Sequence, residues 1–479
     1  MASVGTTSGG AQRISLWRAT IFALCGMPVT AATAALLIYL PPHLATRLGV
    51  SLTVVGAVWF AVRLIDIAFD PMLGMLMDRT RTRLGRYRPW LLAGAPVLML
   101  GIGMLFFAPV GISKLYMVSW LLVLYVGLSI LSLAPPAWAA TLAKSYDDRS
   151  RLFGIMAAMA ILALLITLSI PAFTGQVLKL GDADAVHAMG WFLIGLTPVV
   201  VGIAVWLTPE PLSQDRRTLP GLARDDLAAV LRRKNLLRLY AAQMAMTLGP
   251  GWMSSIFLFF AKDYMHFTGG QASMLLMFYV VAGLLGAPTT AWLATRIGKH
   301  RAVMVVAISY SLGLLTVLLP PKGVFWASVP VNMWCGFAGA GFELTIRSML
   351  ADVADEARLE DGRDRLSLIF SLNTAAAKMA SATAIIISFP LLQRLGYVPK
   401  LGHANTPDAI RGLGLTFVSG PIACVVLGAL FMIGWKLTAE RHAEIRTALE
   451  ARDAEAALGL DGQHIADAAA VAEAQAVGG

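Results

Sequence analysis

Two aspartates in one apolar segment are the residues of this chain best suited to chemistry. Asp66 and Asp70 are four residues apart within residues 51–77, so a helix places both carboxylates on one face. A charged carboxylate inside a membrane is costly unless a proton, a metal cation or a basic side chain neutralises it. The pair therefore predicts either a site for a coupling cation or proton, or a buried salt bridge with Arg63 or Lys378.

Other charged and polar residues in apolar segments form a second set. Glu343 and Arg347 are four residues apart, acid first, the order that favours a helical ion pair. They either neutralise each other or present a charge to a substrate. Lys378 follows Asn373 by little more than one turn, and it needs an anion, either the two aspartates or an acidic substrate. The residues that we predict to line a substrate cavity are Arg63, Trp138, Glu343, Arg347, Asn373 and Lys378.

The composition shows where these charged groups must lie. Of the 479 residues, 57% are hydrophobic and only 14% are charged, whereas soluble domains carry about 25% charged residues. The chain lacks the polar surface that water requires, so we predict a multi-pass protein of the cell inner (plasma) membrane. Neither the three cysteines nor the seven histidines have metal-ligand spacing. We therefore expect no metal site and no cofactor beyond a coupling ion, H⁺ or Na⁺.

Apolar segments of spanning length predict the architecture. A spanning helix needs about 20 mostly apolar residues, and twelve such segments occur between residues 19 and 436. Most of the 38 Lys and Arg residues fall on one side if both termini are cytoplasmic, which satisfies the positive-inside rule and explains the net charge without a nucleic-acid partner. The predicted divisions are a cytoplasmic N-terminus 1–18, six-helix bundles 19–208 and 236–437, a cytoplasmic linker 209–235 and a cytoplasmic tail 438–479.

Three spaced motifs carry a resemblance to a known family. Residues 63–74 read R-x-x-D-x-x-x-D-P-x-x-G, and the basic segment Gly85-Arg-Tyr-Arg-Pro-Trp90 follows. Asp352 and Asp355 after span ten, and Lys378 in span eleven, also match. The chain resembles the glycoside–pentoside–hexuronide:cation symporter family of the major facilitator superfamily. The resemblance implies an all-α major facilitator fold and cation-coupled symport of a small organic solute, a sugar or glycoside, by alternating access. We expect a monomer whose partners are this solute and the lipid bilayer.

In that family, the positions matching Asp66 and Asp70 bind the coupling cation. Here the sequence departs from the family, because Phe69 replaces an Asn that supplies an oxygen ligand, and Leu131 replaces a hydroxyl ligand in span four. A hard cation such as Na⁺ needs several oxygen ligands (by analogy with other hard ions), whereas a proton needs one basic oxygen. We therefore expect H⁺ rather than Na⁺ as the coupling ion.

The family's sugar ligands are also missing. Acidic residues in spans one and four and an Arg in span five are replaced by Thr30, Ala134 and Met159. Trp138 remains as a surface on which a sugar ring could stack, or as an ordinary interfacial tryptophan. These losses favour a less hydroxylated, amphipathic or lipid-like substrate as the alternative to a sugar.

Charged residues at the cytoplasmic ends of the spans form a third set. They either form ion pairs between the two halves that close the inner gate, or they only set the topology. The predicted gating residues are Asp78, Arg79, Arg86, Arg88, Asp352 and Asp355.

Two functions outside transport are alternatives. A membrane enzyme would use the Asp pairs to bind Mg²⁺-diphosphate, but twelve spans in two halves argue against it, and we expect no catalytic residues. A membrane sensor or scaffold would not need Asp70. The sequence has no phosphate-binding loop.

Overall fold

The computed structural model describes residues 15–143, 145–210, 224–363 and 365–454. Parts of the predicted N-terminus 1–18, linker 209–235 and tail 438–479 lie outside these residues. The helices of the first half are α1 (Leu16–Ala23), η1 (Leu24–Gly26), α2 (Met27–Ala34), η2 (Ala35–Tyr39), α3 (Leu40–Thr46), α4 (Leu52–Arg79), α5 (Arg88–Phe106), α6 (Lys114–Leu142), α7 (Tyr146–Gln176) and α8 (Asp182–Leu207). Those that follow are α9 (Arg224–Leu231), α10 (Lys234–Phe259), η3 (Phe260–Tyr264), α11 (Gly269–Ile297), α12 (Lys299–Thr316), α13 (Phe325–Gly339), α14 (Gly341–Asp361), α15 (Leu366–Arg394), η4 (Pro399–Ala404) and α16 (Pro407–Leu430).

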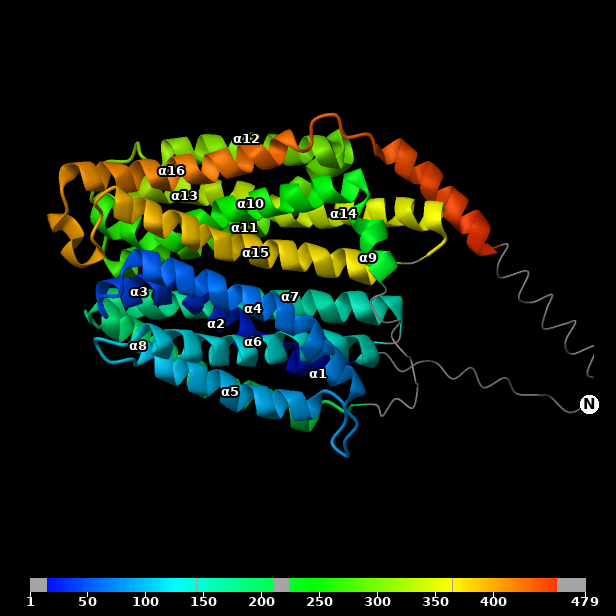
Figure 1. Ribbon diagram of the computed structural model, residues 1–479, viewed down its shortest axis with the longest axis horizontal. Coiled ribbons are helices and arrows are strands. Elements are labelled where there is room, and N and C mark those ends of the chain that lie inside the picture. The colour runs from blue at the N-terminus through cyan, green and yellow to red at the C-terminus, as the bar shows by residue number, and fades with distance from the viewer. Residues whose placement is uncertain (1–14, 144, 211–223, 364, 455–479) are drawn as a thin grey trace, which may run out of the picture.

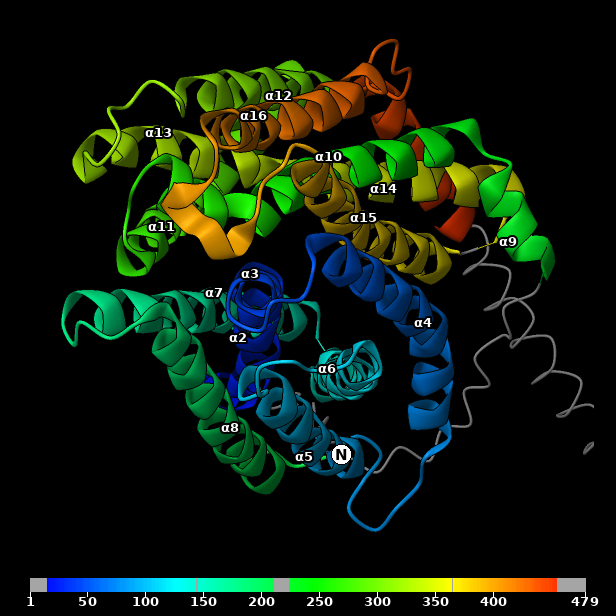
Figure 2. The ribbon, with the colours of Figure 1, turned by 60° about the vertical axis from the view of Figure 1, so that its left-hand side comes forward.

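The long helices form two groups that lie side by side (Figure 1). Helices α1–α8 make up the first half and α10–α16 the second. The halves meet where α4 packs on α15 and where α7 packs on α11 (Figure 2). Helix α1 and the end of α16 lie toward one end of the bundle, called here the terminal end (Figure 1). The all-helical, two-bundle prediction is confirmed for the described residues.

Ten helical stretches in the described residues are long and apolar enough to cross a membrane. The other two crossings are less regular. The stretch from Phe325 to Asp361 is divided into α13 and α14 at Ala340, and α12 begins with Lys299, His300 and Arg301. These basic side chains in its first turn lower the mean hydropathy of the 18-residue helix α12.

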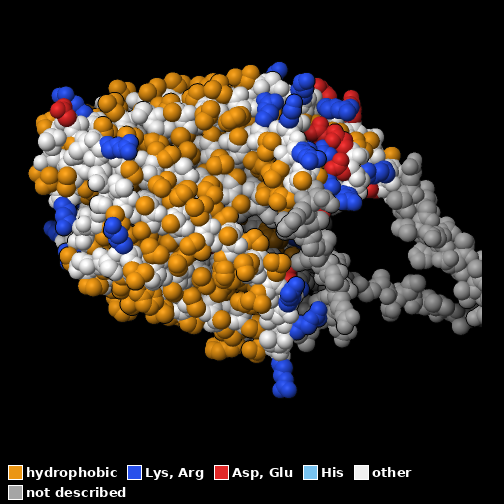
Figure 3. Space-filling view, viewed as in Figure 1, with side chains coloured by type: hydrophobic (Ala, Val, Ile, Leu, Met, Phe, Trp, Pro, Cys, Tyr) orange, Lys and Arg blue, Asp and Glu red, His pale blue; other side chains and the backbone are white. Residues whose placement is uncertain are grey.

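Several helices approach so closely at glycines that their backbones are in contact. A Cβ on Gly286 of α11 would lie 1.8 Å from the carbonyl oxygen of Phe337 on α13, and one on Gly336 would lie 2.0 Å from that of Tyr279. Small residues allow such close approach, which is the common way in which helices pack within membranes. The outer face of the bundle is apolar (Figure 3), with exposed Trp206 and Leu285 as examples.

A helix formed by residues 439–454 packs at the terminal end against α14. The side chains of Ile445 and Leu449 are buried. Arg358 on α14 donates to both carboxylate oxygens of Asp453, at 3.0 and 2.9 Å. This helix is therefore joined to the second half by apolar and charged contacts.

Candidate substrate and cation site

The packing of α4 on α15 brings the two aspartates next to the lysine. A Cβ on Gly56 of α4 would lie 3.1 Å from the carbonyl oxygen of Ile385 on α15. Nearby, the amide and the hydroxyl of Thr53 both donate to Oε1 of Gln393 at 3.0 Å. The two helices therefore have a fixed register, which places Lys378 beside the carboxylates of α4.

Asp66 is buried, and both of its carboxylate oxygens are bound. Oδ1 accepts a hydrogen bond from Ser129 Oγ at 2.7 Å. Oδ2 accepts from Arg63 Nη1 and from Lys378 Nζ, each at 3.1 Å. Of the two possibilities that the sequence left open for Asp66, the salt bridge is present in this structure.

Asp70 is bound on one oxygen only. Lys378 donates to Oδ2, whereas Oδ1 is buried and has no hydrogen-bond partner within the described part of the chain. An unsatisfied buried acceptor costs about 1–3 kcal/mol.

The charges of this cluster cancel and come from both halves. Arg63, Asp66 and Asp70 lie on α4, and Lys378 lies on α15. With Lys378 in place, the two carboxylates are already matched by two cations. No group of three or more His, Cys, Asp or Glu side chains in the described ranges is arranged to hold a metal ion.

A small cavity of about 100 Å³ lies next to this cluster. Arg63 and Lys378 contribute to its wall, and the Arg63 guanidinium lies 4.9 Å from the centre of the Tyr125 ring. Aliphatic side chains make up much of the rest of the lining. The remaining lining residues are Val29, Thr33, Leu36, Leu37, Leu128, Ser129 and Ser132.

Asn373 is buried near this level of α15, and its Oδ1 has no partner among the described residues. Phe69 instead packs against the apolar core, so its ring contributes no ligand. Buried polar groups are nearly always hydrogen-bonded, and two of the buried oxygens without a partner in the described residues, on Asp70 and Asn373, lie in this region.

Glu343 and Arg347 form the local pair that their spacing favours. Arg347 Nη2 donates to Glu343 Oε1 at 2.6 Å, and both side chains are more than half exposed. They lie on the exposed face of α14, where they neutralise each other. Charges at this depth do not face lipid at low cost, so this face is better suited to water than to hydrocarbon.

Trp138 has no free ring face in this structure. Its side chain is fully buried, and its ring meets Phe22 edge-on with centroids 5.1 Å apart. Arg88 lies over the same ring at 5.8 Å. A ring packed in this way, within the buried core, has no surface left for a sugar.

The predicted gating residues pair within their own halves. Asp78 accepts from Arg86, and Arg88 donates to the carbonyl oxygen of Thr208. Arg79 is exposed. None of these contacts crosses between the halves, although all of them lie at the terminal end.

The second half shows the same behaviour. Lys299 Nζ donates to Asp352 at 2.7 and 2.8 Å, and His442 Nε2 lies 3.1 Å from Asp355 Oδ2. Asp352 thus joins α12 to α14. That these groups form ion pairs between the halves in another conformation stays a prediction.

Glu210 makes a contact with the start of α5 that the sequence did not indicate. Its carboxylate accepts from the backbone amides of Arg86, Tyr87 and Arg88, at 2.6, 2.9 and 3.2 Å. These amides form the start of α5, where the helix dipole favours a negative charge. The carboxylate therefore attaches the beginning of the linker to the loop after α4.

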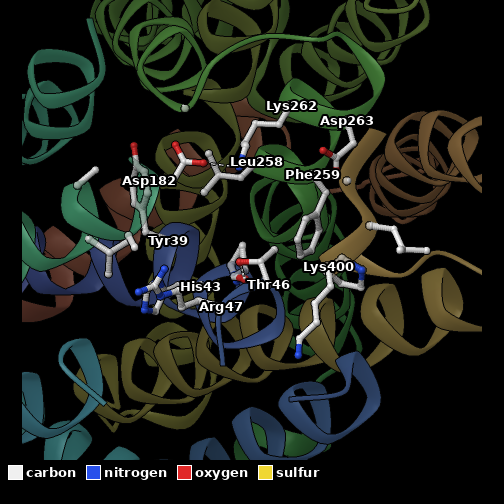
Figure 4. A pocket seen from close by; sticks show the side chains of 18 of the residues that line it. Tyr39, His43, Thr46, Arg47, Asp182, Leu258, Phe259, Lys262, Asp263 and Lys400 are labelled. Carbon is white, nitrogen blue, oxygen red and sulfur yellow. Dashed lines mark hydrogen bonds and ion pairs between the residues drawn. The ribbon is translucent and has the colours of Figure 1, made fainter. Parts of the chain in front are cut away.

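At the end opposite the termini, side chains join the two halves directly. The contacts are Tyr39 Oη with Ser273 Oγ at 2.8 Å, Gln176 Nε2 with Thr268 Oγ1 at 3.0 Å, and the ion pair of Lys262 with Asp182. Tyr39, Asp182 and Lys262 also line a cavity of about 600 Å³, whose walls come from both halves (Figure 4). At the terminal end, by contrast, the surface is hollowed between the halves (Figure 3).

Comparison with known sequences decides the family. The sequence pattern of the MFS/sugar transport protein family matches residues 21–439. The chain belongs to this family. It is 26% identical to the isoprimeverose transporter of Lactiplantibacillus pentosus, over 81% of this chain and 82% of the relative. It is 24% identical to the sodium-dependent lysophosphatidylcholine symporter 1 of Xenopus tropicalis, over 92% and 91%, and 22% identical to the glucuronide carrier protein homolog of Escherichia coli K12, over 84% and 89%.

Solved structures confirm the fold of this MFS transporter. A variant of the nucleoside transporter NupG superposes with a TM-score of 0.63 at 15% identity, covering 88% of this chain and 99% of that one. A bacterial homolog of the human lysosomal transporter Spinster gives a TM-score of 0.62 at 12% identity, covering 91% and 97%. The chain is therefore a multi-pass membrane transporter of the major facilitator superfamily and not an enzyme.

Proposed function

We propose that this MFS transporter is a proton-coupled symporter of a small organic solute, a sugar or glycoside, in the cell inner membrane. Its relatives include proteins named as an isoprimeverose transporter and as a glucuronide carrier protein homolog, which supports a carbohydrate-like solute. We propose Asp70 as the residue that takes up and releases the coupling proton.

The observation that supports this role is the arrangement around Lys378. Its ammonium group comes from the second half and binds carboxylates of the first half, on Asp66 and on Asp70. Protonation of Asp70 would remove one of these two attractions, while Asp66 keeps its bonds to Ser129 and Arg63. A proton on Asp70 would thus weaken a contact between the halves without leaving a carboxylate buried and unpaired.

The oxygen atoms near this site favour H⁺ over Na⁺. Both oxygens of Asp66 are engaged, and of the four carboxylate oxygens of the cluster only Oδ1 of Asp70 is without a partner in the part of the chain described; the neutral amide oxygen of Asn373 also lacks one. A hard cation needs several oxygens, and the ring of Phe69 supplies none. A proton needs only the one oxygen that is free. One relative is named as sodium-dependent, so the ion must be tested directly.

The conformation suggests how the two sides alternate. Side chains join the halves at the end opposite the termini, and the surface is hollowed at the terminal end. If the termini are cytoplasmic, this is a state open to the cytoplasm. In the proposed cycle, solute and proton leave from this state into the cytoplasm. Lys378 then pairs again with Asp70, and the halves can return to the state open to the opposite side of the membrane.

The test is uptake into proteoliposomes that contain the purified full chain. Radiolabelled pentosides, hexosides, uronides and amphiphiles are offered under a pH gradient at equal Na⁺, and under a Na⁺ gradient at equal pH. We expect uptake of at least one carbohydrate under the pH gradient only, abolished by Asp70→Asn. Asp408→Asn, a change of an exposed carboxylate on α16, is the matched control and leaves uptake unchanged.

Two results would oppose the proposal. Uptake driven by Na⁺ at equal pH, with no response to a pH gradient, excludes proton coupling. Proton-coupled uptake that survives Asp70→Asn excludes the proposed site.

A second candidate is an amphipathic or lipid-like solute in the same fold. Val29, Leu36, Leu37 and Leu128 line the same small cavity as Arg63 and Lys378, so apolar and charged side chains lie together. Preferential uptake of the amphiphiles in the same panel would favour this candidate.

A further inference from the structure

A second cavity of the described structure lies away from the proposed proton site. It is about 600 Å³ in volume, within the range of small-molecule sites of about 300–1,000 Å³. Its walls come from α3 and α8 of the first half and from α10, η3 and η4 of the second (Figure 4). A molecule bound here would contact both halves at the end where they are joined.

The acidic side chains of this cavity are already engaged. The carboxylate of Asp182 forms an ion pair with Lys262. The same carboxylate lies against the start of α11, since a Cβ on Gly269 would be 2.0 Å from Asp182 Oδ1. Asp263 is buried and accepts the hydroxyl hydrogen of Tyr397. Asp182 is therefore matched by a cation, whereas the hydrogen bond to Asp263 comes from a neutral hydroxyl.

Two basic side chains of the wall have no acidic partner in the described ranges. Arg47 ends the first span, and Lys400 lies on η4 of the other half. No ion pair joins either of them to a carboxylate among the described residues, and both side chains are exposed. In Figure 4 they lie on two sides of Thr46, with His43 beside Arg47. The cavity thus has a surplus of positive charge contributed by both halves.

We propose that this outer cavity binds a small organic anion with a single carboxylate or phosphate group, held between Arg47 and Lys400. Both groups accept charge-assisted hydrogen bonds from guanidinium and ammonium donors. The volume leaves room for a body the size of a sugar beside the anionic group. That this anion is also the transported solute rests on the proposed transport function, whereas binding itself does not.

Binding is measured by isothermal titration calorimetry on the purified full chain in nanodiscs. The probes are methyl β-glucuronide and methyl β-glucoside, which differ only in the carboxylate, together with glucose 6-phosphate. We expect the glucuronide or the phosphate to bind at least about tenfold more tightly than the glucoside, with an affinity that falls as salt is raised. Which of the two binds more tightly identifies the anionic group.

The variants assign the site. Arg47→Gln and Lys400→Gln should each weaken binding of the anionic probe about fivefold, and together about 25-fold, for partly exposed charge-assisted contacts. The matched control is Lys114→Gln, an exposed basic residue at the start of α6 that does not line the cavity, and it should leave binding unchanged.

Two outcomes overturn the proposal. One is equal binding of the charged and the uncharged probes. The other is tight anion binding that the double variant does not weaken, which would place the site elsewhere. Because binding is measured without a gradient, failure here is distinct from failure of proton-coupled uptake.

Discussion

The most informative perturbation of the central cluster is Lys378→Met. Lys378 is the only described cation that contacts both Asp66 and Asp70, and its side chain is 20% exposed while those of the acids are 2% and 17% exposed. Methionine keeps the length of the side chain and removes the charge. Breaking a largely buried pair by deleting one partner costs about 3–5 kcal/mol, because the other charge stays buried. At neutral pH we expect a loss of this size in the free energy of unfolding.

The second half of the prediction is a rescue. In the double variant Lys378→Met with Asp70→Asn, the orphaned carboxylate is gone, while Asp66 retains Ser129 and Arg63. The double variant should therefore recover at least about 2 kcal/mol of the loss. Reversible denaturant unfolding in mixed micelles measures both values.

The control replaces Lys262, whose ion pair with Asp182 is half exposed. Such surface pairs contribute about 0.2–1 kcal/mol, so Lys262→Met should cost no more than that. A double variant no more stable than Lys378→Met alone would refute the reasoning, since the cost would then come from lost packing rather than from an unpaired carboxylate.

Three further predictions concern other contacts. Ser129→Ala removes a 2.7 Å hydrogen bond to Asp66 and should cost about 1.5–3 kcal/mol in the same unfolding assay; a change below 0.5 kcal/mol (about the size of a neutral surface substitution) would contradict the assigned contact. Gly286→Ala places a Cβ 1.8 Å from a carbonyl oxygen and should sharply reduce the yield of folded protein, whereas Gly195→Ala, with nothing within 4 Å, should not. On α9, the hydrogen bond from Arg365 holds the pKa of the Asp226 carboxyl below its usual 3.8. Because that pKa is lower in the folded state, the contact stabilises α9 above about pH 3.8 and is lost as the pH falls through the folded value. Hydrogen exchange of α9, corrected for intrinsic rates, should therefore accelerate in acid in the wild type, and Arg365→Gln should be fast at every pH.

The charged cluster was predictable because charge is expensive in a membrane. Asp66, Asp70 and Lys378 are recognisable from their types alone within apolar segments, and helical periodicity places the two aspartates on one face. The partner of Asp66 on α6 was not predictable. Ser129 is a small hydroxyl residue in a span that contains other serines, and only the packing of α6 on α4 selects it.

One expectation differs from the structure, and one contact was not foreseen, for similar reasons. The sequence around a tryptophan near a span end does not show whether the ring lines a cavity or packs in the core. Trp138 lies in the core. Glu210 stands beside prolines just after span six, where it looks like an ordinary linker residue. Its role depends on the start of α5 being close in space, which no local pattern encodes.

The helix of residues 439–454 offers an experimental advantage. Because Ile445, Leu449 and Asp453 attach it to the second half, a spin label or fluorophore on its exposed face would report the orientation of that half as a rigid body. A second label at Leu84, in the exposed loop after α4, would mark the first half. The distance distribution between the two labels, recorded across pH and solute concentration, would then measure the movement of the halves in a single preparation and without a transport assay.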